Sequence, residues 1–341
     1  MHRVSRLLGL VFLSLLALSA QAAERHWRFA IEEIRGSVQD RYAQRFKDLI
    51  EERTDGRVEV TVYPYGALGT SAQVTELVQM GIIEFAFASP GHLGAVVPES
   101  QVFTLHFVLS PDEEVTHRVL SDSAPLYAVL RPAYRQRLLH LLSVVSEGWM
   151  AWTADRPLRA PEDFEGLKIR TMVSPLLMDV YEAYGATPTP MAYSEIYSAL
   201  QLNMIDAQVN PVFAIEEMSF YEVQDDMMLP RHMAFITTLV TNPAFYDGLP
   251  EDLRKVVDGV VEELEDYVFE VQRDLNDRRL QTIRDASDIA IITLDDGERA
   301  RFREASMPVR ERYLEKGGAR AGQVLDTLLG EMDRVERQGS D

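Results

Sequence analysis

The sequence has no cysteine among its 341 residues, and this absence excludes several kinds of chemistry at once. Disulfide frameworks, thiolate zinc sites, iron–sulfur clusters and cysteine nucleophiles all need the thiol group. The chain also lacks G-x-G-x-x-G, G-x-x-x-x-G-K and G-x-S-x-G signatures. Its seven histidines include no pair with metal-ligand spacing. We therefore expect no metal, no cofactor and no covalent catalysis.

Basic residues are scarce as well. The chain has 34 Lys and Arg against 54 Asp and Glu, a formal net charge of −20. Such a surface repels phosphate backbones, so we expect no nucleic-acid partner. A buried arginine could still bind an anion, because surface charge is screened within about 10 Å. The adjacent acid pairs are not expected to be catalytic, because neighbouring residues do not share a face, and runs of acid in so acidic a chain are expected to be solvated. They are Glu32-Glu33, Glu113-Glu114, Glu216-Glu217 and Asp225-Asp226.

Long hydrophobic runs are confined to the first residues. Residues 1–23 combine two arginines, an apolar run from Leu7 to Leu18 and the small-residue pattern Ala20-Gln21-Ala22. This pattern is typical of a secretory signal peptide cleaved near Ala22/Ala23. A membrane anchor is the alternative, but the run is shorter than the roughly 20 residues that span a bilayer. We expect a periplasmic protein that is not inserted in the membrane.

The mature chain alternates strand and helix patterns. Residues 27–31, 58–63 and 82–88 are predicted strands, separated by helical spacing around 42–50 and 71–80. This order predicts an α/β fold with a largely parallel sheet.

A second region repeats the same order of patterns. A strand at 168–172 precedes helices at 174–184 and 193–202, and a strand at 207–209 follows. Residues 77–84 and 199–206 echo one another, as either two related lobes or two similar turns would produce. Two open sheets would place a ligand cleft beyond the carboxyl ends of their strands. From Leu249 to about Ile283 the apolar residues recur at helical steps, which predicts one long helix packed along several elements.

Arg170 is the most informative single residue, because it lies where an apolar strand meets a loop. A guanidinium offers a planar fork of donors that fits a carboxylate. A surface or interdomain salt bridge is the alternative role. Asn210, before Pro211, could add an amide donor or could be a turn residue.

Several motifs in this region resemble the substrate-binding subunits of TRAP transporters, the DctP family. They are Gly166-Leu167-Lys168-Ile169-Arg170, Gly185-Ala186-Thr187-Pro188-Thr189-Pro190-Met191, Glu195-Ile196-Tyr197-Ser198-Ala199-Leu200-Gln201 and Asp206-Ala207-Gln208-Val209-Asn210-Pro211. The resemblance implies a two-lobed periplasmic binding protein fold, α/β, with a mixed sheet in each lobe and a long helix spanning both. It places the carboxylate-binding arginine at Arg170, the supporting amide at Asn210 and a covering aromatic at Tyr193. Ser89 falls where sialic-acid binders frequently carry Glu.

The resemblance also suggests how the chain is divided. Residues 24–147 and 238–292 would form lobe I, and residues 148–237 lobe II. Residues 293–341 would form C-terminal helices packed on the lobes. The partners would be a small organic acid and the membrane permease of the transporter.

One departure from the family pattern bears on the ligand. Met150 stands where many dicarboxylate and sugar-acid binders carry a second arginine. A second ligand carboxylate would then be desolvated without a partner, which costs several kcal/mol. Five apolar residues could line the cleft, although a core position is equally expected for them: Trp149, Met150, Trp152, Met172 and Phe213.

We therefore expect a receptor for a monocarboxylate with an apolar or aromatic body. A C4-dicarboxylate or a hydroxy or keto acid is the alternative ligand. The other function classes are an exported hydrolase or lyase, which would need an acid/base pair that the sequence does not assemble, and a sensor subunit with the same ligand.

Overall fold

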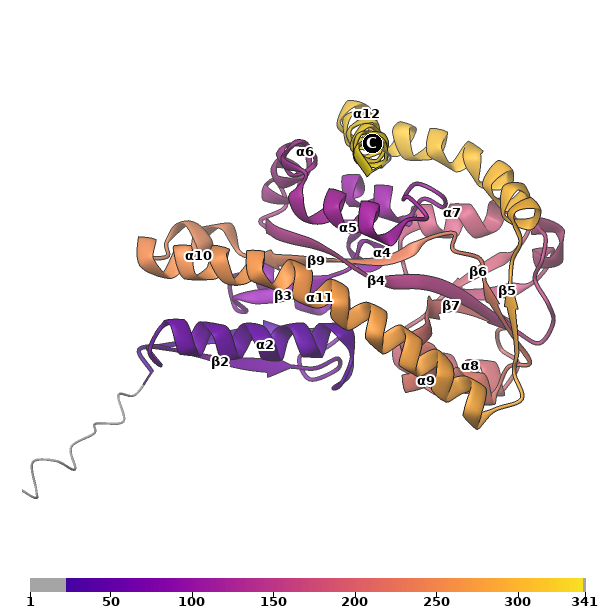
Figure 1. The fold of residues 1–341 in the computed structure, drawn as a ribbon, viewed down its shortest axis with the longest axis horizontal. Helices are drawn as coiled ribbons and strands as arrows, with labels where there is room; N and C mark the ends of the chain where they lie inside the picture. Colours follow the sequence, from indigo (N-terminus) through magenta and orange to yellow (C-terminus); the bar gives the residue numbers. More distant parts are fainter. Residues whose placement is uncertain (1–22, 340–341) are drawn as a thin grey trace, which may run out of the picture.

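The computed structural model describes residues 23–339, in which a mixed sheet carries helices on both sides (Figure 1). The predicted signal peptide, residues 1–23, lies outside the described residues except for Ala23. Within residues 23–339 no helix is both long and apolar enough to cross a membrane.

The sheet has ten strands in the order β2-β1-β3-β9-β4-β7-β5-β6, and β8 pairs with both β4 and β10. Strands β1, β2 and β3 pair in parallel, as do β5, β6 and β7, whereas β9 and β4 are antiparallel to their neighbours. The strands are β1 (Arg25–Ala30), β2 (Val58–Tyr63), β3 (Phe85–Ala88), β4 (His140–Ala154), β5 (Lys168–Thr171), β6 (Thr187–Pro190), β7 (Ala207–Pro211), β8 (Asp226–Leu229), β9 (Ala234–Thr241) and β10 (Ala290–Thr293).

Helices follow most of the strands, as the α/β prediction requires. The α-helices are α2 (Val38–Arg53), α3 (Ser71–Gln79), α4 (Pro90–Leu93), α5 (Glu113–Asp122), α6 (Ala124–Arg135), α7 (Pro175–Ala183), α8 (Ile196–Gln201), α9 (Val212–Glu217), α10 (Pro243–Asp247), α11 (Glu251–Ala286) and α12 (Asp296–Gly339). Short 3-10 helices are η1 (Pro98–Thr104), η2 (Pro161–Phe164), η3 (Tyr193–Glu195) and η4 (Phe220–Glu222).

Strand β4 joins the two halves of the sheet. Up to Trp149 it pairs with β9, whereas its last residues, from Met150 on, pair with β7. The register shifts between Ser146 and Trp149, around Gly148, whose φ is 107°. We call the half that contains β1, β2 and β3 lobe I, and the half that contains β5, β6 and β7 lobe II. The register shift lies beside the predicted boundary at 147/148, and the boundaries themselves stay a prediction.

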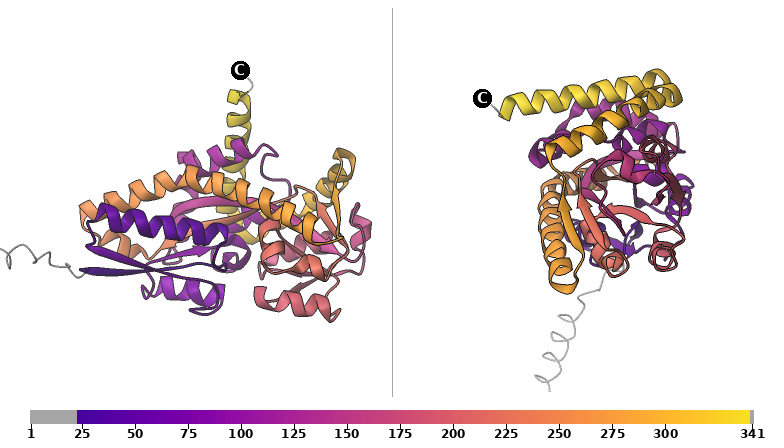
Figure 2. Two further views of the ribbon diagram at one scale, coloured as in Figure 1. Left: turned by 60° about the horizontal axis from the view of Figure 1, so that its bottom comes forward. Right: turned by 90° about the vertical axis from the view of Figure 1, so that its right-hand side faces the viewer.

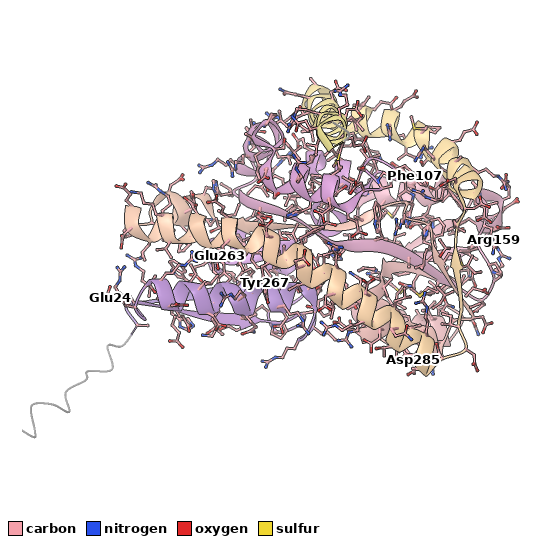
Figure 3. The ribbon with its side chains drawn as sticks, in the orientation of Figure 1. Glu24, Phe107, Arg159, Glu263, Tyr267 and Asp285 are labelled. Carbon is pink, nitrogen blue, oxygen red and sulfur yellow. The ribbon has the colours of Figure 1, made fainter. Side chains whose placement is uncertain are left out.

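Two long helices extend across both lobes (Figures 1 and 2). Helix α11 packs on α2 of lobe I, on β4 and on α9 of lobe II, which confirms the long spanning helix. Among its exposed charges, Glu263 pairs with Arg45 and Arg53 of α2, and Asp285 lies near its C-terminal end (Figure 3). Helix α12 packs on α5 and α6 and also on α7. It is kinked at Gly318, whose φ is 63°.

The prediction of a strand at 82–88 is wrong for the first residues of that range. The amides of Ile82 and Ile83 both donate to the Leu77 carbonyl, at 2.9 and 3.3 Å, and Gly81 has a φ of 69°. These bonds make a turn at the end of α3, so the strand begins only at Phe85.

The echo of this segment in lobe II is a turn of the same kind. The amides of Met204 and Ile205 both donate to the Ala199 carbonyl, at 2.8 and 3.4 Å, and Asn203 has a φ of 54°. The same hydrogen-bond pattern therefore leads from a helix into a strand in each lobe.

Gly148 offers a test of the strand crossing. A Cβ on this residue would lie 2.4 Å from Asn276 Nδ2 and 3.0 Å from Gln272 Oε1, both on α11. A side chain also disfavours the left-handed backbone by about 1–2 kcal/mol. We expect Gly148→Ala to lower the free energy of unfolding by at least that amount in urea titrations.

The matched control is Gly330→Ala. A Cβ at Gly330, inside α12, would meet nothing within 4 Å. Alanine there should leave the free energy of unfolding unchanged or raise it by up to about 1 kcal/mol. Equal stabilities of the two variants would contradict a strained crossing at Gly148.

Candidate functional site

A cavity lies between the two lobes, where the parallel strands of each lobe end. It is small in this structure, with a volume of about 30 Å³ open to the centres of water molecules. From lobe I it is lined by Glu32, Glu33, Tyr65, Ser71 and His92. From lobe II and the crossing strand β9 it is lined by Arg170, Met172, Tyr193, Asn210, Pro211, Ala214 and Phe235.

Arg170, on β5, is the cation of this cavity. The residue is 1% exposed, and its Nε and Nη2 donate to the Met191 carbonyl at 3.3 and 3.1 Å. No carboxylate of the described residues lies within ion-pair distance of it. Burial lowers the pKa of Arg170 to about 10, so the guanidinium remains charged at neutral pH. A buried cation without an anion is costly, which leaves this wall of the cavity suited to an anionic ligand group.

Glu32 and Glu33 line the cavity from lobe I, in the loop that follows β1. They are 7% and 5% exposed, so the prediction that this acid pair is solvated is wrong. Glu32 Oε2 accepts a hydrogen bond from the Ser89 amide at 2.8 Å, and Oε1 lies 3.2 Å from His92 Nδ1. Glu33 Oε2 accepts from the Gln39 amide at 3.2 Å. Two carboxyl groups from lobe I and a guanidinium from lobe II therefore line the same cavity.

Aromatic rings cover the space between these charges. The rings of Tyr65 and Tyr193 meet edge to face with centroids 5.9 Å apart, and this contact joins the two lobes. Tyr193 Oη donates to the Ala214 carbonyl at 3.3 Å. Met172 and Phe235 complete an apolar part of the wall. The residues of the site thus offer both charge signs and flat apolar faces.

Asn210 and Ser89 have different relations to the cavity. Asn210 lines it, and its Nδ2 donates to Gln208 Oε1 at 2.6 Å. Ser89 is fully buried behind the wall. The Ser89 amide is bonded to Glu32, and its Oγ lies 3.0 Å from His92 Nδ1. Ser89 therefore holds two residues that line the cavity.

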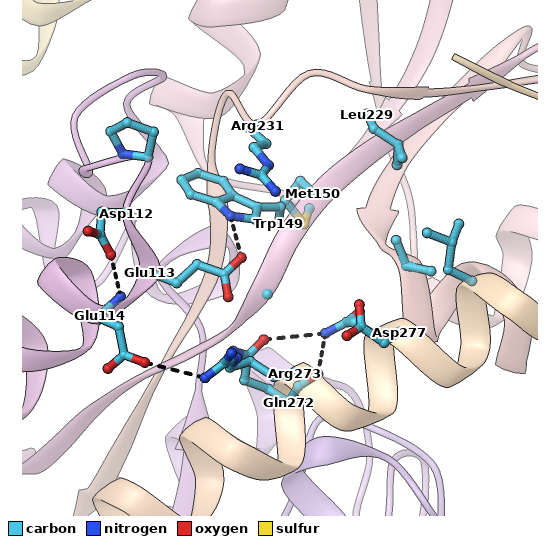
Figure 4. A pocket seen from close by; sticks show the side chains of 15 residues that line it. Asp112, Glu113, Glu114, Trp149, Met150, Leu229, Arg231, Gln272, Arg273 and Asp277 are labelled. Carbon is cyan, nitrogen blue, oxygen red and sulfur yellow. Dashed lines mark hydrogen bonds and ion pairs between the residues drawn. The ribbon is translucent and has the colours of Figure 1, made fainter. Parts of the chain in front are cut away.

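The remaining predicted residues lie elsewhere. Trp149 and Met150 line a second, larger cavity between α5, the end of β8 and α11 (Figure 4). There the Trp149 Nε1 donates to Glu113 Oε1 at 2.8 Å. Trp152 is fully buried in a hydrophobic core, where its Nε1 donates to Tyr181 Oη at 3.0 Å. Phe213 is fully buried in the core below α11.

The sequence reasoning missed Glu32, Glu33, Tyr65, Ser71, His92 and Phe235. A usable signal existed for the first three, because each directly follows an apolar strand of a parallel pair, where ligand sites of α/β sheets lie. Nothing in the local sequence distinguishes Phe235 from a core residue. Among residues 23–339 no cluster of three or more His, Asp or Glu is arranged to hold a metal ion.

Comparison with known proteins shows the family of the chain. The family model DctP, bacterial extracellular solute-binding protein family 7, matches residues 29–316. The chain belongs to this family.

Three relatives are similar over nearly the whole chain. The ectoine-binding periplasmic protein TeaA of Halomonas elongata is 35% identical over 95% of each chain. Its solved structure covers 91% of this chain and 99% of its own, with a TM-score of 0.87. The ectoine/5-hydroxyectoine-binding protein UehA of Ruegeria pomeroyi is 34% identical over 93% of each chain. A TRAP periplasmic solute-binding protein from Marinobacter aquaeolei is 44% identical, with a TM-score of 0.85 over 89% of this chain and 99% of its own.

Family membership confirms the main predictions. The two-lobed α/β fold and the role of a transporter's solute-binding protein, rather than an enzyme, are those of the family. TRAP solute-binding proteins bind small molecules and work with membrane components of the transporter. The relatives are periplasmic.

Glu217 permits a test of the electrostatics behind the site. Its side chain is 4% exposed, and neither carboxyl oxygen has a hydrogen-bond partner among the described residues. Burial raises the pKa of Glu217 to about 9. An unfolded glutamate titrates near about 4.3, so the unfolded chain releases this proton first as the pH rises. The stability of the folded protein should therefore fall between about pH 5 and pH 9.

We expect Glu217→Gln to remove this loss of stability with rising pH. The Tm advantage of the variant over the unmodified protein should grow from pH 5 to pH 9 and reach on the order of 5 °C. Glu262→Gln, on the exposed side of α11, is the control and should show a constant difference. A Tm difference for Glu217→Gln that does not change with pH would show that this carboxyl is ionised throughout.

Proposed function

We propose that the chain is a TRAP receptor for a small zwitterion that carries one carboxylate and one delocalised cationic head. The observation that carries the proposal is the pairing of walls in the cavity. Arg170 has no anionic partner among the described residues, and Glu32 and Glu33 line the same cavity from the other lobe. A ligand carboxylate at Arg170 would neutralise the buried guanidinium through two parallel hydrogen bonds. A cationic head would meet the two carboxyl groups.

The other lining residues suit such a ligand. Tyr65, Tyr193 and Phe235 present ring faces and edges on which a flat cationic ring gains cation–π attraction. The Asn210 amide could add a hydrogen bond to the carboxylate, as expected from the sequence. Met172 can adapt to an irregular apolar surface. The proposed ligand is thus the monocarboxylate expected from the sequence, but with a positive charge on its body.

Ectoine is the compound with this chemistry that the relatives point to. TeaA and UehA are named for binding it. Ectoine combines one carboxylate with a cyclic amidinium, whose charge is spread over two nitrogens. A C4-dicarboxylate is disfavoured, because its second carboxylate would approach Glu32 and Glu33 instead of a cation. We infer that the liganded receptor delivers its solute to the membrane permease of the transporter.

A thermal-shift screen separates the ligand classes. Ectoine at 100 times its dissociation constant should stabilise the fold by about 2.7 kcal/mol, which shows as a clear rise in Tm. Succinate, as a dicarboxylate, and benzoate, as an aromatic acid without a cation, should give little or no shift. A large shift with benzoate and none with ectoine would contradict the cationic head, whereas a shift with succinate alone would favour the dicarboxylate alternative.

Arg170→Ala tests the carboxylate contact. Loss of one partner of a buried charge pair costs about 2–5 kcal/mol, so ectoine affinity should fall by more than about tenfold in calorimetry. Arg170→Lys should also lose affinity, because an ammonium cannot make the bidentate contact. Arg278→Ala removes an exposed arginine of α11 and should leave the affinity unchanged. Retention of affinity within about tenfold in Arg170→Ala would rule out the assigned contact.

A further inference from the structure

Gln39 connects the ligand cavity to a buried carboxyl group that does not line it. Its backbone amide donates to Glu33 Oε2 at 3.2 Å, and its Nε2 donates to Glu147 Oε1 at 3.0 Å. Its Oε1 accepts from the Glu32 amide at 2.7 Å. Gln39 is 1% exposed and Glu147 is fully buried. One residue in the first turn of α2, through its backbone amide and its side chain, therefore fixes both cavity glutamates relative to β4.

Glu147 accepts fewer hydrogen bonds than a buried carboxylate needs to replace its lost hydration. Its Oε2 has no hydrogen-bond partner among the described residues, and its Oε1 shares the residue Gln39 with the Glu33 carboxyl. Two carboxylates that bond to the same buried residue repel each other, which favours a proton on one of them. Burial raises the pKa of Glu147 to about 7, and burial together with Glu147 raises the pKa of Glu33 well above its usual range.

The groups packed around this pair come from several elements. Most are acidic or neutral, and the cations stand at the margins. They are Glu32 and Ser37 before α2, Asp40 on α2, His92 on α4, Arg170 on β5, Tyr193 on η3, Glu216 and Glu217 on α9, and Arg279 on α11. Arg279 Nη1 lies 2.6 Å from Glu216, so the nearest basic group on α11 is already paired.

We propose that Glu147 is a positioning residue of the ligand site, which holds one proton between its own carboxyl and that of Glu33 until a cationic ligand head enters and expels it. The inference rests on the proposed zwitterionic ligand. A positive charge beside Glu33 favours the ionised form of both carboxyls, so ligand binding and proton release become one linked equilibrium. Glu147 has no contact with the ligand in this scheme. It acts through Gln39 and Glu33.

The position of Glu147 adds a second link. Its carbonyl accepts from Asn276 Nδ2 of α11 at 2.9 Å, and the next residue, Gly148, is where β4 crosses between the lobes. The proton is therefore held at the point where the two lobes join. A change in the charge of the Glu33–Glu147 pair therefore changes the electrostatic environment of the crossing strand β4.

The first experiment needs no ligand. Carboxyl resonances of ¹³C-labelled glutamate are followed by NMR between pH 5 and pH 9 in the unmodified protein and in Glu147→Gln. We expect one carboxyl of the Glu33–Glu147 pair to be still protonated near pH 7, and Glu33 to titrate at lower pH once Glu147 is replaced. Full ionisation of both carboxyls at pH 7 in the unmodified protein would overturn the proposal.

The second experiment uses ectoine as the probe. Calorimetry in phosphate and in Tris should differ in heat by the release of up to about one proton for each ectoine bound at pH 7. The affinity should rise with pH by at most about tenfold per unit below the transition. In Glu147→Gln both the proton release and the pH dependence of the affinity should decrease, because Glu33 titrates at lower pH without its neighbour, while binding remains. A merely structural role of Glu147 would weaken binding equally at every pH.

Glu217→Gln is the matched control, because Glu217 is also a buried glutamate near Glu33 but is not bonded to Gln39. It should keep the proton release of the unmodified protein. If proton release were lost in Glu217→Gln and kept in Glu147→Gln, the proton would be held by Glu217 and not by the Glu33–Glu147 pair. That result would overturn the proposal. Failure of ectoine to bind the unmodified protein would instead contradict the proposed function, and the NMR titration would still decide whether the pair holds a proton.

Discussion

A guanidinium buried without an anion is the constraint on which the rest of the site depends. Arg170 is held by the Met191 carbonyl, which orients the fork but does not neutralise its charge. A neutral carbonyl compensates only part of the lost hydration of a cation. A bound anionic ligand can neutralise the charge that residues 23–339 leave without an anionic partner. The energetic cost of burying Arg170 and the affinity for an anion thus have the same physical origin.

The two lobes divide the charge of the cavity between them. Lobe II brings the cation on β5, and lobe I brings Glu32 and Glu33 after β1. Each lobe alone therefore presents a wall of one sign, and a ligand with both signs contacts each wall with the opposite charge. The contact between Tyr65 and Tyr193 fixes how near the walls come. Recognition in this arrangement depends on the closed geometry, since an open cleft would separate the two charges.

The sequence predicted the scaffold better than the lining of the cavity. The strand at 58–63 and the long helix could be predicted because alternation and helical spacing are local properties of the sequence. Arg170, Tyr193 and Asn210 were found through ordered family motifs. Trp152 could not be assigned in this way, because a residue on the crossing strand can face either a core or a cleft, and that choice depends on which helices cover the strand. Glu32 and Glu33 were misjudged since acid pairs in an acidic chain are usually solvated, and only the distant partners Gln39 and Ser89 make their burial possible.

The path of the chain through the sheet limits how this receptor can change. The backbone passes between the lobes along β4, returns along β9, and crosses again in α11 and α12. Lobe I combines strands from before and after lobe II in the sequence, so it cannot be exchanged as one continuous segment or produced by a single cut. New ligand preferences must therefore arise by substitution within the lining loops, because a deletion in β4 would flip every side chain beyond it to the opposite face.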